Sequence, residues 1–268
     1  MKVRVKFSKA GSMKFIGHLD VMRYFQKAIR RSGLDIGYSQ GFNPHQLISF
    51  ASPLGVGLTS DGEYMDMQMK SSLSSKEAVR RLNEVMNDEI QVLEYWELDE
   101  NSKNAMSIVA AADYCVSLKD GYEFVDQFHQ KFDEFLTQEQ IMITKKTKKS
   151  ERVVDVKPYI YDYAYSASDF EKKTGSCIEN SVAQVYENGT CVYLQMAAGS
   201  VVNIKPEMIM EAFCEYAKVK YEPFAYQIHR RELYADRNAD PKAEVSQYGK
   251  NRDLVSLGWF GHVIEEEI

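Results

Sequence analysis

The first 33 residues switch from a hydrophobic period of two to one of 3.6, and this change constrains the fold more than any other feature. Residues 2–7 alternate between faces as a β-strand does. Three apolar residues share one face and three basic residues the other: Val3, Val5 and Phe7 against Lys2, Arg4 and Lys6. From about residue 18 to 32 the period is helical, with Gly33 suited to the helix end. The pattern predicts a half-buried strand with an open basic face, followed by an amphipathic helix whose apolar stripe is Leu19, Met22, Phe25 and Ile29.

The rest of the first hundred residues continues this alternation of strands and helices. Residues 46–51 and 63–69 are strand candidates, and 90–98 is a closing strand. Between them lies a helix over about 75–87, which Ser74 and Glu77 introduce as a capping box. The resulting order, βαββαβ, is that of a ferredoxin-like domain. We therefore expect an N-terminal domain of this kind, with a basic face, over residues 1–101.

The second half repeats the order over residues 105–234. The predicted strands and helices are 107–118, 122–136, 140–144, a hairpin of 181–187 and 190–197 about Asn188-Gly189, 206–217 and 224–234. A basic insertion spans about 145–178. Residues 235–268 are polar and acidic, and we expect a loosely ordered tail. The predicted fold class is α+β, with tandem duplicated ferredoxin-like units built on antiparallel sheets.

Composition narrows the class of protein. The chain has 268 residues, 44% of them hydrophobic, which suffices for a buried core. It has no apolar leader and no run of about 18 apolar residues, so we expect no membrane association. Four cysteines stand apart without a C-x-x-C pair, at Cys115, Cys177, Cys191 and Cys214. This spacing argues against a disulfide framework, a zinc ribbon or an iron–sulfur cluster and favours a cytoplasmic setting without cofactors.

The formal net charge of -6 averages over unlike segments. Residues 1–33 carry nine basic groups and one acid, a balance of +8, whereas the remainder has 24 basic and 38 acidic groups, or -14. The nine are Lys2, Arg4, Lys6, Lys9, Lys14, Arg23, Lys27, Arg30 and Arg31. The last four fall within an arc of about 100° on the predicted helix. Either this arc is an ordinary solvated face or it binds an anionic partner such as nucleic acid.

Two further groups of residues are candidate binding or catalytic elements. His18, Asp20 and Arg23 begin the helix, where they either cap it or border a phosphate site at its positive end. The loop Gly41–His45 is either a rigid turn or a binding loop. In the second interpretation Phe42 is a stacking platform for a base, and Asn43 and His45 supply hydrogen bonds.

A second basic run lies in the insertion, at Lys145, Lys146, Lys148 and Lys149. It is either a solvated loop or an arm that contacts phosphates. His229-Arg230-Arg231 adds positive charge near the last strand. His18 and His45, with Asp20 or Asp66, lack the close spacing of a helical ligand pair, so no metal site is predicted.

Six motifs in the first 66 residues resemble one bacterial family. They are F-x-K-x-G, H-L-D with Arg23, Arg30-Arg31, G-F-N-P-H at 41–45, P-L-G-V-G at 53–57 and E-Y-M-D at 63–66. The chain resembles the radical SAM-linked proteins, or domain of unknown function 2344. It has Gly17 where the family often has Ser. The resemblance implies a protein that occurs alone or fused behind a B12-binding radical SAM enzyme, with genes near those for ribosome or RNA processing.

These features lead to one favoured function and two alternatives. The chain lacks C-x-x-x-C-x-x-C, so any radical SAM enzyme would be a separate partner chain. We expect an RNA-binding or substrate-presenting accessory protein, non-catalytic itself, with tRNA or rRNA as possible ligands. One alternative is a metal-independent ribonuclease or RNA-modifying enzyme that uses His18 and His45, with Asp20 as a further catalytic candidate. The other is a protein-interaction module. The test is whether His18, Arg23, Phe42 and His45 converge.

Overall fold

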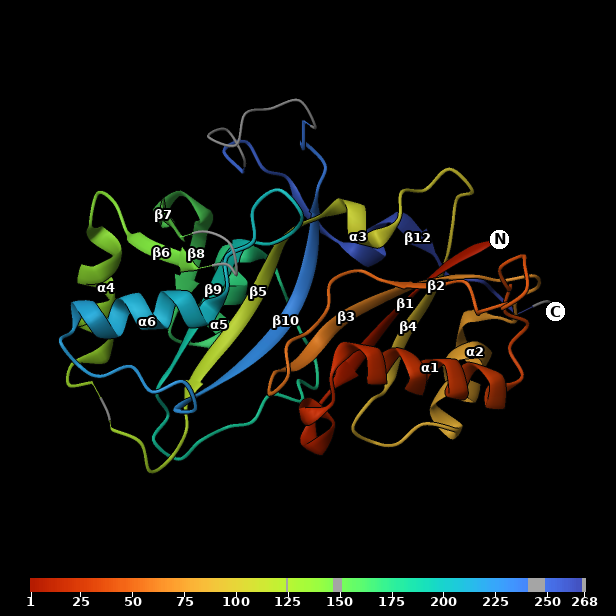
Figure 1. The fold of residues 1–268 in the computed structure, drawn as a ribbon, viewed down its shortest axis with the longest axis horizontal. Helices are drawn as coiled ribbons and strands as arrows, with labels where there is room; N and C mark the ends of the chain where they lie inside the picture. Colours follow the sequence, from red (N-terminus) through yellow and green to blue (C-terminus); the bar gives the residue numbers. More distant parts are fainter. Residues whose placement is uncertain (124, 147–150, 241–248, 267–268) are drawn as a thin grey trace.

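The chain folds into an α+β structure built on one large sheet (Figure 1). The structure, a computed structural model, describes residues 1–123, 125–146, 151–240 and 249–266. Within those ranges, ten strands form the main sheet, most of them paired antiparallel. Eight of these strands lie side by side in the order β12-β4-β1-β3-β10-β5-β9-β8. The other two are off this path: β2 pairs with β3, and β11 pairs with β10.

The N-terminal half carries its helices on one face of the sheet (Figure 1). Its elements are β1 (Lys2–Lys9), η1 (Gly11–Phe15), α1 (His18–Ser32), β2 (Ile48–Phe50), β3 (Thr59–Gln68), α2 (Ser75–Glu84) and β4 (Val92–Leu98). Val3, Val5 and Phe7 of β1 pack against Phe25 and Ile29 of α1. The predicted change from strand to helix is confirmed because these apolar faces form one core.

The ends of the two helices follow local signals. Gly33 takes the left-handed conformation (φ 73°) after α1, as predicted. The Ser74 hydroxyl accepts a hydrogen bond from the Glu77 N–H and caps α2, which confirms that part of the capping box. The predicted stripe of α1 is wrong at Leu19, which is 61% exposed, because Val21 faces the core instead.

The second half also places two helices on one face of its strands (Figure 1). Its elements are α3 (Ala105–Ile108), β5 (Val109–Leu118), α4 (Phe128–Thr137), β6 (Met142–Lys146), β7 (Glu151–Asp155), η2 (Lys157–Tyr159), β8 (Ile160–Ala164), α5 (Ala167–Thr174), β9 (Cys191–Ala197), α6 (Pro206–Tyr216) and β10 (Tyr226–Asp236). Phe128 and Phe132 of α4 pack against Phe213 of α6. The start of α6 at Pro206 is as predicted.

Two predictions for this half are wrong. Residues 181–187 form no strand, because the Asn188 turn bonds elsewhere: its backbone N–H and side-chain amide both donate to Asp120. The helix predicted from residue 122 begins only at Phe128, after Gln127 in the left-handed conformation (φ 56°).

The two halves share one sheet instead of forming separate ones. Strands β3 and β10 pair in parallel, with Thr59 opposite His229 and Ser60 opposite Arg230. The backbones approach so closely that a Cβ at Gly62 would lie 2.5 Å from the Arg231 carbonyl oxygen. Glycine is therefore required where the halves join. We call this junction the seam.

The expectation of a loosely ordered tail is wrong for its described part. Strand β11 (Leu254–Ser256) pairs with β10, and β12 (Gly261–His262) pairs with β4. Between them, η4 (Leu257–Phe260) buries the Leu257 side chain completely. Residues 249–266 thus bind both halves of the sheet. Burial of an apolar side chain outweighs the polar character of the surrounding sequence.

Candidate functional site

The basic side of β1 is largely covered and is not the open face that was predicted: Arg4 is buried, and Lys2 and Lys6 are half-buried. The Arg4 guanidinium donates from Nε to Asp66 Oδ1 (2.7 Å) and from Nη2 to Asp66 Oδ2 (3.0 Å). It also donates to the carbonyls of Lys103 and Leu257, segments that cover this face. Lys6 pairs with Glu232 at 2.7 Å. These cations neutralise internal carboxylates instead of meeting a ligand.

The other early lysines are also held by the protein. The Lys9 ammonium donates to the Ile16 carbonyl (3.2 Å), and burial lowers the pKa of Lys9. Lys14 donates to Gln227 Oε1 (3.2 Å) and lies over the Phe15 ring. Lys2 donates one hydrogen bond, to the Ser102 carbonyl (3.0 Å), at the edge of the sheet. Of these lysines, Lys2 alone borders the cavity described below.

The four helix cations, in contrast, are exposed on α1. Arg23 pairs with Asp20 at 3.1 Å, one turn along the same helix. Arg31 donates to the Val85 carbonyl (2.6 Å). Lys27 and Arg30 have no hydrogen-bond or ion-pair partner among the described residues. A nearly uncompensated positive surface remains, and we call Arg23, Lys27 and Arg30 the α1 face.

The loop Gly41–His45 packs beside this helix and leaves its aromatic ring in solvent. The Ser39 hydroxyl bonds to His45 Nδ1 (2.8 Å) and accepts from the His45 N–H (3.1 Å), which closes the loop. The Gln46 amide donates to the Gln26 carbonyl of α1 (3.2 Å). The Phe42 side chain is fully exposed. Gln46, one residue beyond His45, thus joins the end of this loop to α1.

His18 lies apart from His45. It begins α1 behind Gly17, which caps without a side-chain bond, and its ring meets Phe50 edge-on at 5.2 Å. A small cavity of about 10 Å³ there is also lined by Lys9 and Glu63, whereas His45 lines a different cavity. No contact or cavity within the described part of the chain joins the two histidines, and Asp20 faces Arg23.

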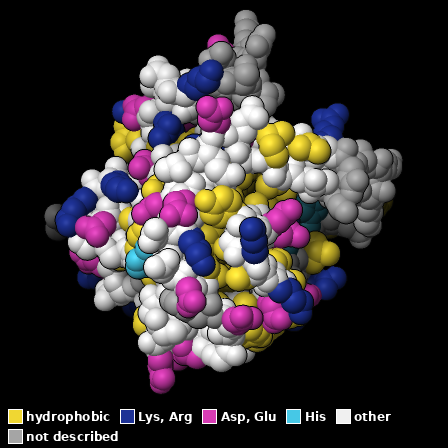
Figure 2. Space-filling view, turned by 90° about the vertical axis from the view of Figure 1, so that its left-hand side faces the viewer, with side chains coloured by type: hydrophobic (Ala, Val, Ile, Leu, Met, Phe, Trp, Pro, Cys, Tyr) yellow, Lys and Arg dark blue, Asp and Glu magenta, His cyan; other side chains and the backbone are white. Residues whose placement is uncertain are grey.

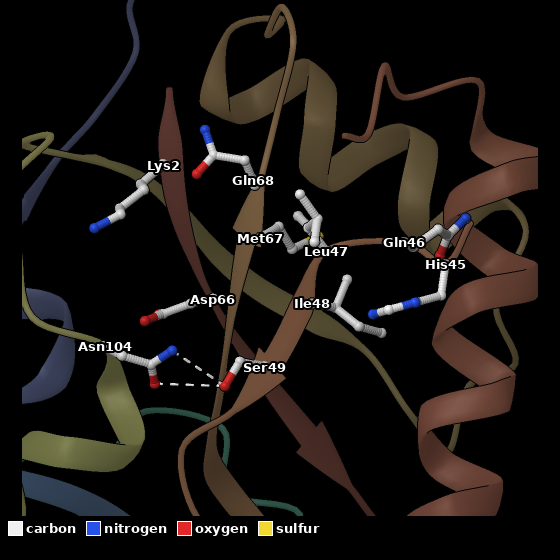
Figure 3. A pocket seen from close by; sticks show the side chains of 10 residues that line it. All are labelled: Lys2, His45, Gln46, Leu47, Ile48, Ser49, Asp66, Met67, Gln68 and Asn104. Atoms are coloured by element: carbon white, nitrogen blue, oxygen red, sulfur yellow. Dashed lines mark hydrogen bonds between the residues drawn. The ribbon is translucent and has the colours of Figure 1, made fainter. Parts of the chain in front are cut away.

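The cavity beside His45 has two of the predicted residues in its wall, at opposite ends of the group drawn in Figure 3. It encloses about 300 Å³ along β2 and the end of β3, with Lys2 and His45 in its wall. Ser49, Gln68 and Asn104 add neutral polar groups, and the Asn104 amide donates to the Ser49 hydroxyl (3.2 Å). Sequence reasoning missed these three residues, because their meeting depends on strand register and on the chain folding back at residue 104. We call this the β2 cavity.

The seam holds a second group of polar side chains, all buried. His229 Nε2 lies 2.8 Å from Asp61 Oδ2, and its Nδ1 lies 2.9 Å from the Thr59 hydroxyl. Arg230 forms a bidentate ion pair with Glu63. Burial raises the pKa of Asp61, but hydrogen bonds from His229, Ser181 and the Val182 N–H outweigh it and lower the pKa overall.

The positive charge that His229-Arg230-Arg231 was predicted to add near the last strand lies inside the protein. All three side chains are buried, and Arg231 pairs with Glu171 (3.1 Å). His229 and Arg230 join the two halves, because Asp61 and Glu63 belong to β3 of the first half. Arg231, in contrast, pairs within the second half. Of the basic run, Lys145 and Lys146 end β6, but their side chains, with Lys148 and Lys149, lie outside the described residues.

Thiol and carboxyl groups near the seam have shifted pKa values. A hydrogen bond with Cys191 lowers the pKa of Cys115 to about 6, against the effect of burial. Burial raises the pKa of Asp113 to about 7, although the Tyr234 hydroxyl donates to it (2.6 Å). Among the described residues, no three His, Cys, Asp or Glu side chains are grouped as metal ligands.

The end of the molecule that carries α4 and α6 has a mixed surface. In Figure 2, Lys and Arg side chains alternate with Asp and Glu over this end. Interspersed signs are typical of a solvated face. The α1 face is thus the more favourable place for an anionic ligand.

The model of a family described as "Uncharacterized protein conserved in bacteria (DUF2344)" matches residues 2–206. A search of curated proteins gives no match. No helix in the described ranges is long and apolar enough to cross a membrane.

Proposed function

This chain belongs to the DUF2344 family of bacterial proteins, and we propose that it is a cytoplasmic RNA-binding accessory protein that presents its ligand to a radical SAM enzyme on a separate chain. The radical SAM partner rests on the family resemblance in the first 66 residues. We further propose that the halves are duplicated ferredoxin-like units. Their strand orders, β4-β1-β3-β2 and β10-β5-β9-β8, are equivalent, and this supports the duplication.

The observation that carries the RNA proposal is the fully exposed Phe42 ring on a loop that Gln46 joins to α1, the helix that bears the exposed cations. A single exposed apolar side chain is common on protein surfaces, so the ring supports the proposal only together with the cations of α1. Single-stranded nucleic acid fits this combination, because bases stack on aromatic rings while phosphates meet nearby cations. Lys27 and Arg30, without partners among the described side chains, are available for that role.

The surface does not favour the acid–base alternative. A histidine pair for RNA cleavage needs both rings within hydrogen-bond reach of one reacting group. His18 and His45 line separate cavities. We therefore propose a binding function, with tRNA or rRNA segments as ligands.

Charge reversal on α1 tests the proposal. Fluorescence anisotropy with labelled single-stranded RNA and tRNA should show that Lys27→Glu with Arg30→Glu weakens binding and reduces the salt slope by about 0.7 for each lost phosphate contact. Phe42→Ala should cost about 1–3 kcal/mol of binding free energy. Lys218→Glu with Lys220→Glu is a matched control, because both lysines are exposed in the second half.

Two results would contradict the proposal. One is an equal loss in the control variant, which would indicate only a general effect of net charge. The other is no binding by the wild-type chain at low salt. A pull-down with and without nuclease then separates RNA from a protein partner, because a protein–protein contact survives the nuclease.

A further inference from the structure

The β2 cavity has His45, the last residue of the Gly41–His45 loop, in its wall. Figure 3 shows the chain from His45 to Ser49 passing Met67 and Gln68 of β3, with Lys2 and Asn104 at the far side. The same loop therefore borders both the exposed Phe42 ring and this cavity. Its volume of about 300 Å³ is at the lower end of the range for small-molecule cavities.

The polar groups in its wall are mainly neutral and only partly used. Gln68 donates from its amide to the Met1 carbonyl (2.9 Å), and its Oε1 accepts no bond from the described residues. His45 Nδ1 is hydrogen-bonded to the Ser39 hydroxyl, which leaves Nε2 of the ring for a ligand. Lys2 keeps two of its three N–H donors after bonding Ser102. The wall thus offers both donors and acceptors.

The one carboxylate in the wall does not make the cavity acidic. Asp66 accepts from Arg4 through both oxygens and from the Ala105 N–H (2.7 Å). Its charge is therefore compensated inside the protein. The remaining charge in the cavity is the Lys2 ammonium, which favours a ligand with a nearby anionic group.

The apolar part of the wall suits a flat ligand. Leu47, Ile48 and Met67 belong to the cavity wall. Met67 is buried in the N-terminal core and Ile48 packs against that core, so Leu47 supplies most of the exposed apolar surface. Aliphatic side chains and an imidazole ring pack on the faces of a planar heterocycle, while amides and hydroxyls bond its edge. An extended peptide would instead need a long free strand edge, and β2 has three residues.

We propose that the β2 cavity binds one purine or pyrimidine base, with Gln68 and the Ser49–Asn104 pair at its edge and Lys2 toward a phosphate. The proposal rests on the RNA-binding function above, in which Phe42 and the α1 face hold neighbouring nucleotides. The cavity would then supply the base selectivity that exposed cations and a stacking ring lack.

Binding of four homo-oligonucleotides tests this selectivity. Fluorescence anisotropy with labelled rA, rC, rG and rU oligomers should show that the wild-type chain prefers one of them. Gln68→Leu should reduce that preference by at least about fivefold while the weaker oligomers bind as before. Ser49→Ala serves as a second variant if Gln68→Leu fails to fold. The control is Gln130→Leu, which removes an exposed amide on α4.

The outcomes separate this proposal from the one it rests on. Equal affinity for all four oligomers, or a preference unchanged in both variants, overturns the cavity proposal and leaves RNA binding intact. If no oligomer binds, the RNA-binding proposal is refuted. Equilibrium dialysis with the four nucleoside monophosphates then tests the cavity proposal separately. Base-selective uptake that Gln68→Leu abolishes supports a free nucleotide as the source of the base. The absence of such uptake overturns the cavity proposal.

Discussion

Replacing Glu63 by Gln should destabilise the fold strongly, because it leaves the Arg230 guanidinium charged and buried at the seam. The two side chains are 5% and 4% exposed. They are joined by a bond of 2.7 Å from Arg230 Nε to Glu63 Oε1 and a second from Nη2 to Oε2. Glutamine keeps the shape and one acceptor oxygen but removes the charge.

The expected loss in the free energy of unfolding is about 3–5 kcal/mol, the usual cost of removing one partner of a buried ion pair. Arg230 cannot escape by losing its proton. The neighbouring Lys9 can lose its proton when the Glu63 charge is removed, because burial already lowers the pKa of Lys9. Replacing both partners, Glu63→Leu with Arg230→Met, should recover most of the loss, because no unpaired charge remains.

Urea unfolding of the full chain at 25 °C, followed by circular dichroism, measures these differences. Glu222→Gln is the control, because its pair with Lys220 is exposed and should contribute less than about 1 kcal/mol. A loss below about 1 kcal/mol for Glu63→Gln would refute the reasoning. So would a double variant that is as unstable as the single one.

Two further predictions concern pH and the tail. Burial raises the pKa of Asp113 to about 7 from an ordinary value of 3.8, so between about pH 4 and 7 the folded chain holds a proton that the unfolded chain has lost. The free energy of unfolding should therefore fall by up to about 1.4 kcal/mol per pH unit as pH rises through this window, relative to Asp113→Asn; parallel urea-unfolding profiles for the two proteins would contradict this. Leu257→Ala should cost about 2–5 kcal/mol in the same assay, because the side chain is fully buried, whereas Val263→Ala, 55% exposed, should change little. Equal small losses would mean that the tail does not stabilise the sheet.

Local elements were predictable where neighbouring residues encode them. The start and end of α1 follow from a period of 3.6 that stops at Gly33, and the capping box at Ser74 marks the start of α2. The false hairpin at Asn188 shows the limit of such signals. Its turn is real, but its hydrogen bonds go to Asp120, about 70 residues away in sequence.

The candidate site likewise has parts that were predictable from the sequence and parts that were not. The exposed cations of α1 and the Phe42 loop were predictable, because helical phase and turn chemistry place them outward. The partners of Arg4 were not, since Asp66 and Leu257 lie 62 and 253 positions away. The sequence alone determined which residues share a face of a strand or helix, because that depends on backbone period. Only the tertiary structure decided whether the face meets water, because that depends on which distant segment covers it.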